Sequence, residues 1–303
     1  MKTCIWITIA GLAVCQAVMA ETSGGNAAER FEEARKLLHG KPGAEDKTHV
    51  FELMMSAARE GHADAAGGVG YCYMTGTGIA KDPAKAVEWF RKGAELGSAK
   101  AQLNFARYLL GTLDAMPKRA ESGIDEKDRE EGIRWLKESA EQGLTEAEAS
   151  LGAYLYNGHH GFARDRTEAE KWLLRAAKAG DANSQNTLGV LYDRGIPEPN
   201  GKLRTDAGKA EAWYRKAALQ DHRKAQANLG KFLDPFSKDE SRRVEALAWT
   251  MLARDNREPT AEKRMIEIGT AVDPTDMQRA AVRARELRIE LIKAQIAKKN
   301  GGQ

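Results

Sequence analysis

The chain has 303 residues, of which 42% are hydrophobic and 30% are charged, and its formal net charge is +3 at pH 7. Acidic and basic residues are mixed along the whole length, so no basic footprint points to nucleic acid, and we expect no nucleic-acid partner. Proline is scarce, and no run alternates apolar and polar residues as a half-buried strand does. These features indicate an all-α protein.

The first twenty residues differ from the rest of the chain. Lys2 precedes an apolar run from Ile5 to Ala17, and small residues follow at the positions that a signal peptidase reads before Glu21. This order is typical of a secretory signal peptide, and the run is too short for a membrane span. We therefore expect residues 1–20 to be removed, the mature chain to have no membrane span, and the product to be periplasmic or secreted.

The cysteines bear on the same question. Residues 12–15 (Leu-Ala-Val-Cys) superficially resemble a lipoprotein box, but Val14 stands where that motif has a smaller residue, so lipidation is the less favoured alternative. Cleavage before Glu21 removes Cys4 and Cys15 and leaves Cys72 alone, so no intramolecular disulfide is possible. We interpret Cys72 as an apolar packing residue, with pairing between two molecules as the alternative.

A helical pattern begins after a short tail. We expect residues 21–28 to be disordered and residues 29–62 to form a degenerate first helix pair. From residue 63 a pattern recurs in which a small residue is followed four later by an apolar-small pair and then three later by Tyr or Leu. Steps of four, one and three place these residues on one helical face. The copies begin at Ala65, Ala101, Ala147, Ser184 and Ala225.

The small residues inside this first helix need a physical reason. The first copy contains Gly70 after Val69, and a glycine inside a helix costs about 0.5–1 kcal/mol relative to alanine. Close approach of a neighbouring backbone is the reason that we expect. Glycines also end the helix, at Gly76, Gly158 and Gly195, where a positive φ is free of a Cβ clash.

A second helix with a tryptophan follows each first helix. The tryptophans stand 36 to 46 residues apart, each between small residues, and we interpret them as core residues: Trp89, Trp135, Trp172, Trp213 and Trp249. An acid seven residues earlier predicts the N-cap, at Asp82, Asp128, Asp165 and Asp206. Asp128 with Glu131 and Asp165 with Glu168 resemble capping boxes. The predicted helix ends are Gly61, Gly97, Gly143, Gly180 and Asp221.

These two helices carry a family resemblance. Residues 65–78 followed by DPAKAVEWFRKGAELG (82–97) resemble a Sel1-like repeat, and so do residues 184–195 followed by DAGKAEAWYRKAALQD (206–221). The match recurs in register over residues 30–256. It implies helix pairs like those of tetratricopeptide proteins, stacked as an α/α solenoid, a right-handed superhelix. We expect about five such repeats over residues 63–256.

Two insertions and a different C-terminal segment interrupt the period. Insertions run from about Asp114 to Lys127 and from Ile196 to Leu203, and we expect loops that either line a binding edge or are neutral. We predict that residues 257–303 form capping helices and a basic tail, because an end repeat cannot bury both its sides. The apolar residues expected to pack on the last repeat are Val282, Leu287, Ile289, Leu291, Ile292 and Ile296.

Catalytic patterns are scarce. His159 and His160 are adjacent in a loop, where a solvated turn is favoured over a metal site, and no serine nucleophile motif occurs. Cysteine-rich Sel1-like proteins, which have been linked to β-lactam binding or hydrolysis, carry a Cys pair in each repeat, and this chain does not. We therefore expect no enzyme, cofactor or metal; a β-lactam- or peptidoglycan-acting enzyme is the disfavoured alternative.

A polar column then remains as the candidate site. The fourth and seventh positions of the first helix lie away from its packed face, and we expect them to line the concave groove and bind a protein or peptide. Plain solvent exposure is the alternative. The candidate residues are Tyr71, Asn104, Arg107, Thr187, Asn228 and Lys231. The predicted function is an exported bacterial adaptor or scaffold; the alternative is an envelope regulator that binds a sensor or enzyme.

Overall fold

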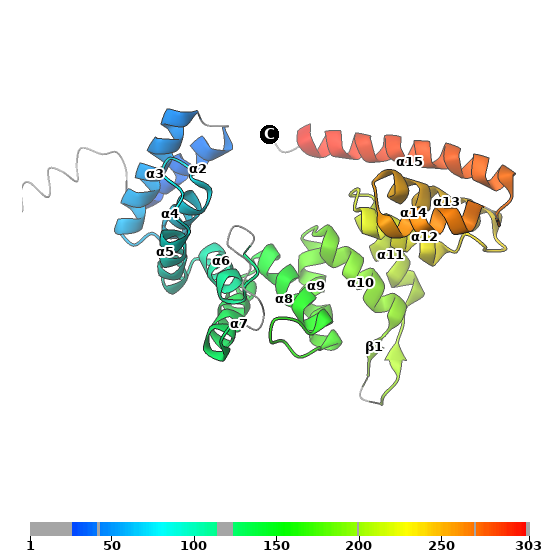
Figure 1. Cartoon of the computed structure of the whole chain (residues 1–303), viewed down its shortest axis with the longest axis horizontal. Coiled ribbons are helices and arrows are strands. Elements are labelled where there is room, and N and C mark those ends of the chain that lie inside the picture. The colour runs from blue at the N-terminus through cyan, green and yellow to red at the C-terminus, as the bar shows by residue number, and fades with distance from the viewer. Residues whose placement is uncertain (1–25, 41–42, 114–123, 199, 270, 301–303) are drawn as a thin grey trace, which may run out of the picture. The chain divides into compact units, whose positions relative to one another are not determined.

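The computed structural model describes residues 26–40, 43–113, 124–198, 200–269 and 271–300 (Figure 1). The chain divides into two compact units, residues 1–142 and 143–303. The predicted signal peptide and residues 21–25 of the predicted disordered tail lie outside the described residues. No helix in the described ranges combines the length and the apolar character needed to cross a membrane.

The first unit consists of helices that pack in chain order, most closely within the pairs α2–α3, α4–α5 and α6–α7. Their bounds are α2 Ala27–His39, α3 Ala44–Arg59, α4 Ala63–Thr75, α5 Pro83–Glu95, α6 Ala99–Leu109 and α7 Glu126–Glu141. The side chain of Asn26 caps α2 by accepting from the backbone amides of Ala28 and Glu29. Ala27 and Ala28 are therefore helical, although we expected them in the disordered tail.

The second unit continues the helix pairs and adds a hairpin and two terminal helices. Its bounds are α8 Thr145–Asn157, α9 Arg166–Lys178, α10 Ala182–Arg194, β1 Ile196–Pro197, β2 Leu203–Arg204, α11 Ala207–Ala218, α12 Arg223–Leu233, α13 Glu240–Asp255, α14 Pro259–Gly269 and α15 Pro274–Asn300. The closest contacts join α8 to α9, α10 to α11 and α12 to α13, and α15 packs on α13. The positions of domain boundaries remain a prediction.

Glycines let the two helices of a pair approach closely. A Cβ on Gly189 of α10 would lie 2.4 Å from the Tyr214 ring of α11, and one on Gly230 of α12 would lie 2.3 Å from the Thr250 hydroxyl of α13. The expected close approach is confirmed, and the neighbour is the second helix of the same pair. The predicted helix ends are confirmed too: Gly61, Gly97, Gly143, Gly180 and Asp221 have φ between 62° and 100°.

The N-cap prediction is confirmed for three helices and wrong for one. Asp82, Asp165 and Asp206 each accept from backbone amides of the first turn. In α7 the cap is Asp125, whose carboxylate accepts from the amide of Asp128 at 2.7 Å. The helix begins one turn earlier than the repeat pattern predicts, so Asp128 lies inside its first turn.

The carboxylates that we assigned to capping boxes have another partner. Glu131 accepts the indole N–H of Trp135 at 3.1 Å, and Glu168 accepts that of Trp172 at the same distance. Both pairs are four residues apart on one helix face. The glutamates therefore fix the tryptophan rings.

The tryptophans are not uniformly core residues. Trp249 is fully buried and Trp135 is 7% exposed, but Trp89, Trp172 and Trp213 are only half-buried. Their rings lie under cations three residues on, with Lys92, Arg175 and Lys216 4.7, 4.8 and 4.4 Å from the ring centres. The residue after the tryptophan is buried in every copy: Phe90, Leu136, Leu173, Tyr214 and Thr250. The core prediction is thus wrong for three indoles, which lie at the edge of the packed stripe.

The second insertion is a hairpin instead of an irregular loop. Strands β1 and β2 pair antiparallel, with Ile196 opposite Arg204, and Ile196 is buried against the second unit. Arg204 also donates to Glu170 of α9 at 2.6 Å. Of the first insertion, residues 114–123 lie outside the described residues.

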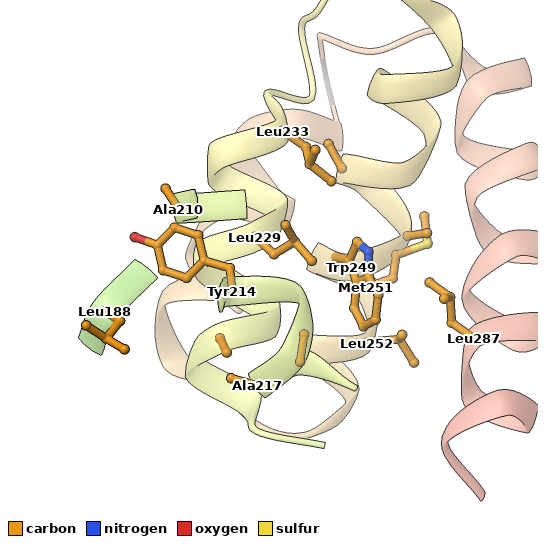
Figure 2. Close-up of a cluster of buried hydrophobic side chains, with 14 of the residues drawn as sticks. Leu188, Ala210, Tyr214, Ala217, Leu229, Leu233, Trp249, Met251, Leu252 and Leu287 are labelled. Carbon is orange, nitrogen blue, oxygen red and sulfur yellow. The ribbon is translucent and has the colours of Figure 1, made fainter. Parts of the chain in front are cut away.

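The C-terminal helix covers α13 with one face only. Ala280, Ala284, Leu287 and Leu291 are buried, and Leu287 belongs to the same apolar cluster as Trp249 (Figure 2). The other apolar residues that we expected to pack there are exposed: Val282, Ile289, Ile292 and Ile296. Residues two apart on an α-helix lie on nearly opposite faces, so one neighbour cannot bury both sets.

Candidate partner-binding surface

The predicted polar column is divided between the two units. Tyr71 on α4 and the pair Asn104 and Arg107 on α6 belong to the first unit, in which α4 contacts α6. In the second unit, Thr187 lies on α10, and Asn228 and Lys231 lie on α12. Tyr71 and Lys231 are exposed, whereas the other four are half-buried. Each unit therefore carries its own part of the candidate surface.

The fourth-position residues do not simply point to solvent. A Cβ on Gly68 would lie 2.7 Å from the Met54 sulfur of α3. The Thr187 hydroxyl donates to the carbonyl of Asn183 on its own helix at 2.8 Å. We expected these positions to point away from the packed face, and that expectation holds better for the seventh positions.

In the second unit, two polar rungs join neighbouring first helices. The side-chain amide of Asn228 on α12 donates to the carbonyl oxygen of Asn186 on α10 at 2.9 Å. One turn away, His222 Nε2 lies 3.0 Å from Asn183 Oδ1. Both rungs connect α10 with α12 across the helix between them in sequence.

The His222 ring is held in one tautomer. Its Nδ1 accepts from the backbone amide of Ala225 at 3.1 Å and so caps α12, which leaves the proton on Nε2 for donation to Asn183. Burial lowers the pKa of His222, because it disfavours the charged ring, and the charge of Lys224 adds to the effect. The rung is therefore made by a neutral histidine.

The Asn186–Asn228 rung has hydrogen-bonding capacity left over. A primary amide has two donor hydrogens and an acceptor oxygen, and this pair uses one donor and one acceptor. Among the described residues, Asn228 Oδ1 and Asn186 Nδ2 have no further protein partner. One acceptor and one donor at a half-buried position match what the main chain of an extended peptide offers.

A second row of polar residues was missed by the sequence reasoning. In four of the five copies the residue after the small first position is polar and buried: Gln102, Glu148, Gln185 and Gln226. Gln185 donates to the Ala177 carbonyl at 3.0 Å and accepts from Gln220 at 2.8 Å. Glu148 pairs with Arg175 at 2.7 Å. The signal was a polar residue recurring beside a small one. The three glutamines donate to carbonyls of the preceding helix pair and so join successive pairs, whereas Glu148 joins the two helices of its own pair.

The other residues that sequence reasoning considered for chemistry, two histidines and a cysteine, are not arranged for a reaction. The rings of His159 and His160 are nearly perpendicular, with centres 6.1 Å apart, and His160 contacts the Tyr154 ring. The described ranges contain no group of three or more residues placed to hold a metal ion. Cys72 is buried, and burial raises the pKa of its thiol to about 11, so the thiolate that would react is not populated near neutral pH.

The architecture defines the class of protein: helix pairs that pack in sequence order, with a terminal helix over the last pair, make an α/α solenoid. The model of the Sel1 repeat family matches residues 63–98, 104–144, 145–181 and 182–222, which together are half of the chain. The chain belongs to the Sel1 repeat family. The predicted fold class is confirmed, and Sel1-repeat solenoids commonly serve as scaffolds for protein interactions.

Three similar proteins illustrate the family. Chitin synthase regulatory factor 3 of Schizosaccharomyces pombe is 31% identical over 250 residues, which are 79% of this chain and 25% of that protein. This chain thus spans about a quarter of that relative's length. A protective antigen of uropathogenic Escherichia coli with an SLR fold has a TM-score of 0.65 at 25% identity, over 89% of this chain and 56% of its own. A Sel1 repeat protein of Oxalobacter formigenes has a TM-score of 0.60 at 27% identity, over 76% and 88%.

Proposed function

We propose that the protein is a bacterial adaptor that works without catalysis and binds an extended segment of a partner protein along the first helices of its repeats. The observation that carries this proposal is the Asn186–Asn228 rung, with its spare donor and acceptor. Lys231, exposed one turn along α12, adds a positive charge beside it. Tyr71 offers an exposed aromatic ring at the equivalent position of the first unit.

The chemistry of these groups favours a peptide over a small molecule. Amide side chains pair with main-chain N–H and C=O groups whatever the sequence of the peptide, and the tyrosine and lysine then select its side chains. Each repeat contributes a modest amount, and affinity comes from the sum over several repeats. Acidic residues in the bound segment would complement Lys231.

Export from the cell is the second part of the proposal. The order of Lys2, an apolar run and small residues before Glu21 supports it. The intact mass of the chain recovered from a bacterial envelope or from the medium should correspond to residues 21–303. A chain that retains Met1 and stays in the cytoplasm would contradict export but would leave the binding surface untouched.

The regulatory version of this function has one specific support. The relative from Schizosaccharomyces pombe is named a regulatory factor of chitin synthase. A solenoid that binds an enzyme in this way holds it in place or in check. For this chain, the partner in that version is an envelope enzyme or sensor, and the binding surface is the same.

Photo-crosslinking tests the surface directly. Benzoylphenylalanine placed at position 71 or 231 should crosslink one partner in cells. The same group at Glu88 of α5 or Ala212 of α11, which are exposed on second helices, serves as the matched control. Equal crosslinking from all four positions would argue against a surface on the first helices.

Substitutions then test the chemistry. Asn228→Ala should lower the yield of the crosslink formed from position 231. Lys231→Glu replaces the probed residue itself, so it is measured with benzoylphenylalanine at position 187 of α10, where it should lower the yield of the crosslink to the same partner. Lys224→Glu makes the same charge change in the first turn of the same helix and should leave the yield unchanged. A partner captured equally well by all of these variants would rule out the Asn186–Asn228 rung as its binding site.

The enzyme alternative has its own assay. The purified mature chain should not hydrolyse a chromogenic β-lactam such as nitrocefin. Turnover that scales with protein concentration and survives repeated purification would overturn the proposal of an adaptor without catalysis.

A further inference from the structure

Helix α15 has two apolar faces, and within the described part of the chain only one of them has a neighbour. Its first face packs on α13 through Leu287 and Leu291. The second face carries four aliphatic side chains that are each about half exposed: Val282 54%, Ile289 53%, Ile292 49% and Ile296 53%. We call these four residues the outer stripe.

The outer stripe has the spacing of a coiled-coil seam. Its members follow one another at steps of seven, three and four, which are the a and d positions of successive heptads. Arg285 fills the one d position among them that is not aliphatic. A seam of this kind is built to pack against another helix, and it differs from the scattered single apolar residues of an ordinary surface.

The end of α15 packs against none of the described residues of its unit. The helix runs to Asn300, yet Leu291 is its last buried residue, and every side chain described from Ile292 to Lys299 is exposed. Short helical segments without tertiary packing are marginal in water. The outer stripe extends into this segment through Ile292 and Ile296, so a partner on the stripe would support it.

We propose that the outer stripe is the contact surface for a second copy of this chain. The two α15 helices pack antiparallel around a two-fold axis that passes between Ile289 and Ile292. Ile289 of each copy then meets Ile292 of the other at the centre. Such an interface is isologous, which is the usual arrangement in homodimers.

The charges beside the stripe favour the antiparallel direction. In an antiparallel pair, positions on one side of the seam face the same positions of the other helix, so Glu286 lies opposite Lys293 of the second copy, twice by symmetry. Arg288 faces the neutral Gln295 and keeps its ion pair with Asp255 at 3.0 Å. In a parallel pair Arg288 would face Lys293, which is a contact between like charges.

The same charges weigh against a lipid surface as the occupant. A helix that lies on an anionic membrane has cations along its polar face and a strong separation of faces. In α15 the exposed surface includes Glu286 and Glu290 beside the stripe, and its first face is already buried in the fold. Both carboxylates pair with Arg283 of the same helix, and Glu286 also faces Lys293 of a second copy, whereas an anionic membrane would repel them.

Sedimentation of the full mature chain tests the proposal. Over micromolar to hundreds-of-micromolar concentrations, the mass should rise from that of one chain to that of two. Ile289→Lys with Ile292→Lys should raise the dissociation constant roughly tenfold or more, because the centre of the seam is lost. Ile266→Lys on α14 is the matched control, since it makes the same change at a residue that is 73% exposed, and it should leave the dimer intact.

A charge exchange tests the direction of packing. Glu286→Lys and Lys293→Glu should each weaken the dimer, and the two together should restore it. A Lys293→Glu variant that dimerises more tightly would indicate parallel helices and overturn the antiparallel arrangement. A chain that stays monomeric at all concentrations would overturn the proposal, and so would one that only binds phosphatidylglycerol vesicles through the same isoleucines. Helicity measured by circular dichroism at concentrations where every protein is monomeric should be the same for all variants, because the substitutions are confined to exposed positions.

Discussion

Trp172 and Trp249 occupy the same place in their repeats, yet they have different surroundings. Each follows a glutamate by four residues and gives it an indole hydrogen bond, at 3.1 Å for Trp172 and 3.2 Å for Trp249. Trp172 is half-buried under Arg175, whereas Trp249 is fully buried. The difference comes from α15, which covers α13 and brings Leu287 into the cluster around Trp249 (Figure 2).

The comparison separates two contributions to burial. The repeat determines which way a side chain leaves its helix and which intrahelical partner it meets. The element that lies outside the helix determines how much of that side chain is removed from water. A repeat pattern therefore predicts orientation well and burial only where the next layer is known.

The largest expected effect is at the covered position. Trp249→Ala should lower the free energy of unfolding by about 3–5 kcal/mol, because it opens a cavity under α15 and leaves Glu245 without its indole donor. Urea denaturation followed by circular dichroism measures the change. Trp213→Ala, at the uncovered equivalent, is the control and should cost clearly less. Equal losses of stability at the two positions would contradict the conclusion that α15 accounts for the difference in burial.

In a repeat that α15 does not cover, truncation of the smaller of two adjacent side chains should cost more stability than truncation of the larger one. Leu173→Ala should cost about 2–4 kcal/mol, because Leu173 is buried and contacts Gly152 of α8 closely. Trp172→Ala removes a larger side chain but exposes less new apolar surface, and it should cost about 1–2 kcal/mol. Urea midpoints of the two variants decide the matter. A greater loss for Trp172→Ala would restore the view of this indole as core.

The early start of α7 predicts a smaller effect. Asp125→Ala should cost about 1 kcal/mol, the typical value of an N-cap, and Asp128→Ala, which removes no N-cap, should cost less. In helix α9 the N-cap is Asp165, as the repeat pattern predicts, so Asp165→Ala should cost the same stability as Asp125→Ala. Thermal denaturation of the three variants checks the order. A loss at Asp128 equal to that at Asp125 would contradict the shifted start.

The smallest effect concerns pH in the second unit. The folded pKa of His222 lies below the unfolded value of about 6.5, mainly because of burial. The neutral His222 ring therefore contributes its full stabilisation above pH 6.5. This stabilisation is lost as the pH falls through the folded pKa, since the unfolded chain then binds the extra proton. His222→Asn keeps a side-chain cap that cannot titrate.

The measurement compares unfolding of the two proteins at pH 7.5 and pH 5.5. The wild type should lose more stability than His222→Asn, by less than about 1 kcal/mol, because the ring is only partly buried and one cap is at stake. His39, which is exposed, is the matched site: His39→Asn should follow the wild type. Identical pH dependence of all three proteins would contradict the role of the neutral ring.

Much of the fold was predictable from particular residues. The spacing of small residues and the glycines that end helices place the helix pairs, because they report intrahelical geometry and positive φ. Asp82, Asp165 and Asp206 mark helix starts for the same local reason. The shifted start at Asp125 was not predictable, because Asp125 and Asp128 both offer a carboxylate that can cap a helix, and the repeat pattern favoured Asp128.

The candidate surface was predictable only in outline. Tyr71 and Lys231 are exposed as expected, because their seventh positions lie outside the packed stripe, whereas Arg107 at the same position is half-buried. Asn228 turned toward α10, because its partner Asn186 belongs to another repeat and no single-helix pattern reveals such a pair. The residues of the outer stripe were predicted to pack on the last repeat, because the sequence alone does not distinguish a helix with two apolar faces from a helix with one broad apolar face.

The buried thiol of Cys72 has a practical consequence for all of these experiments. With its pKa near 11 and no solvent contact, it should stay unmodified by maleimide reagents at neutral pH. If the leader is removed as proposed, Cys72 is the only native cysteine, so a single cysteine introduced at any exposed position becomes a selective attachment point for a dye or spin label. The wild-type chain then provides the unlabelled blank.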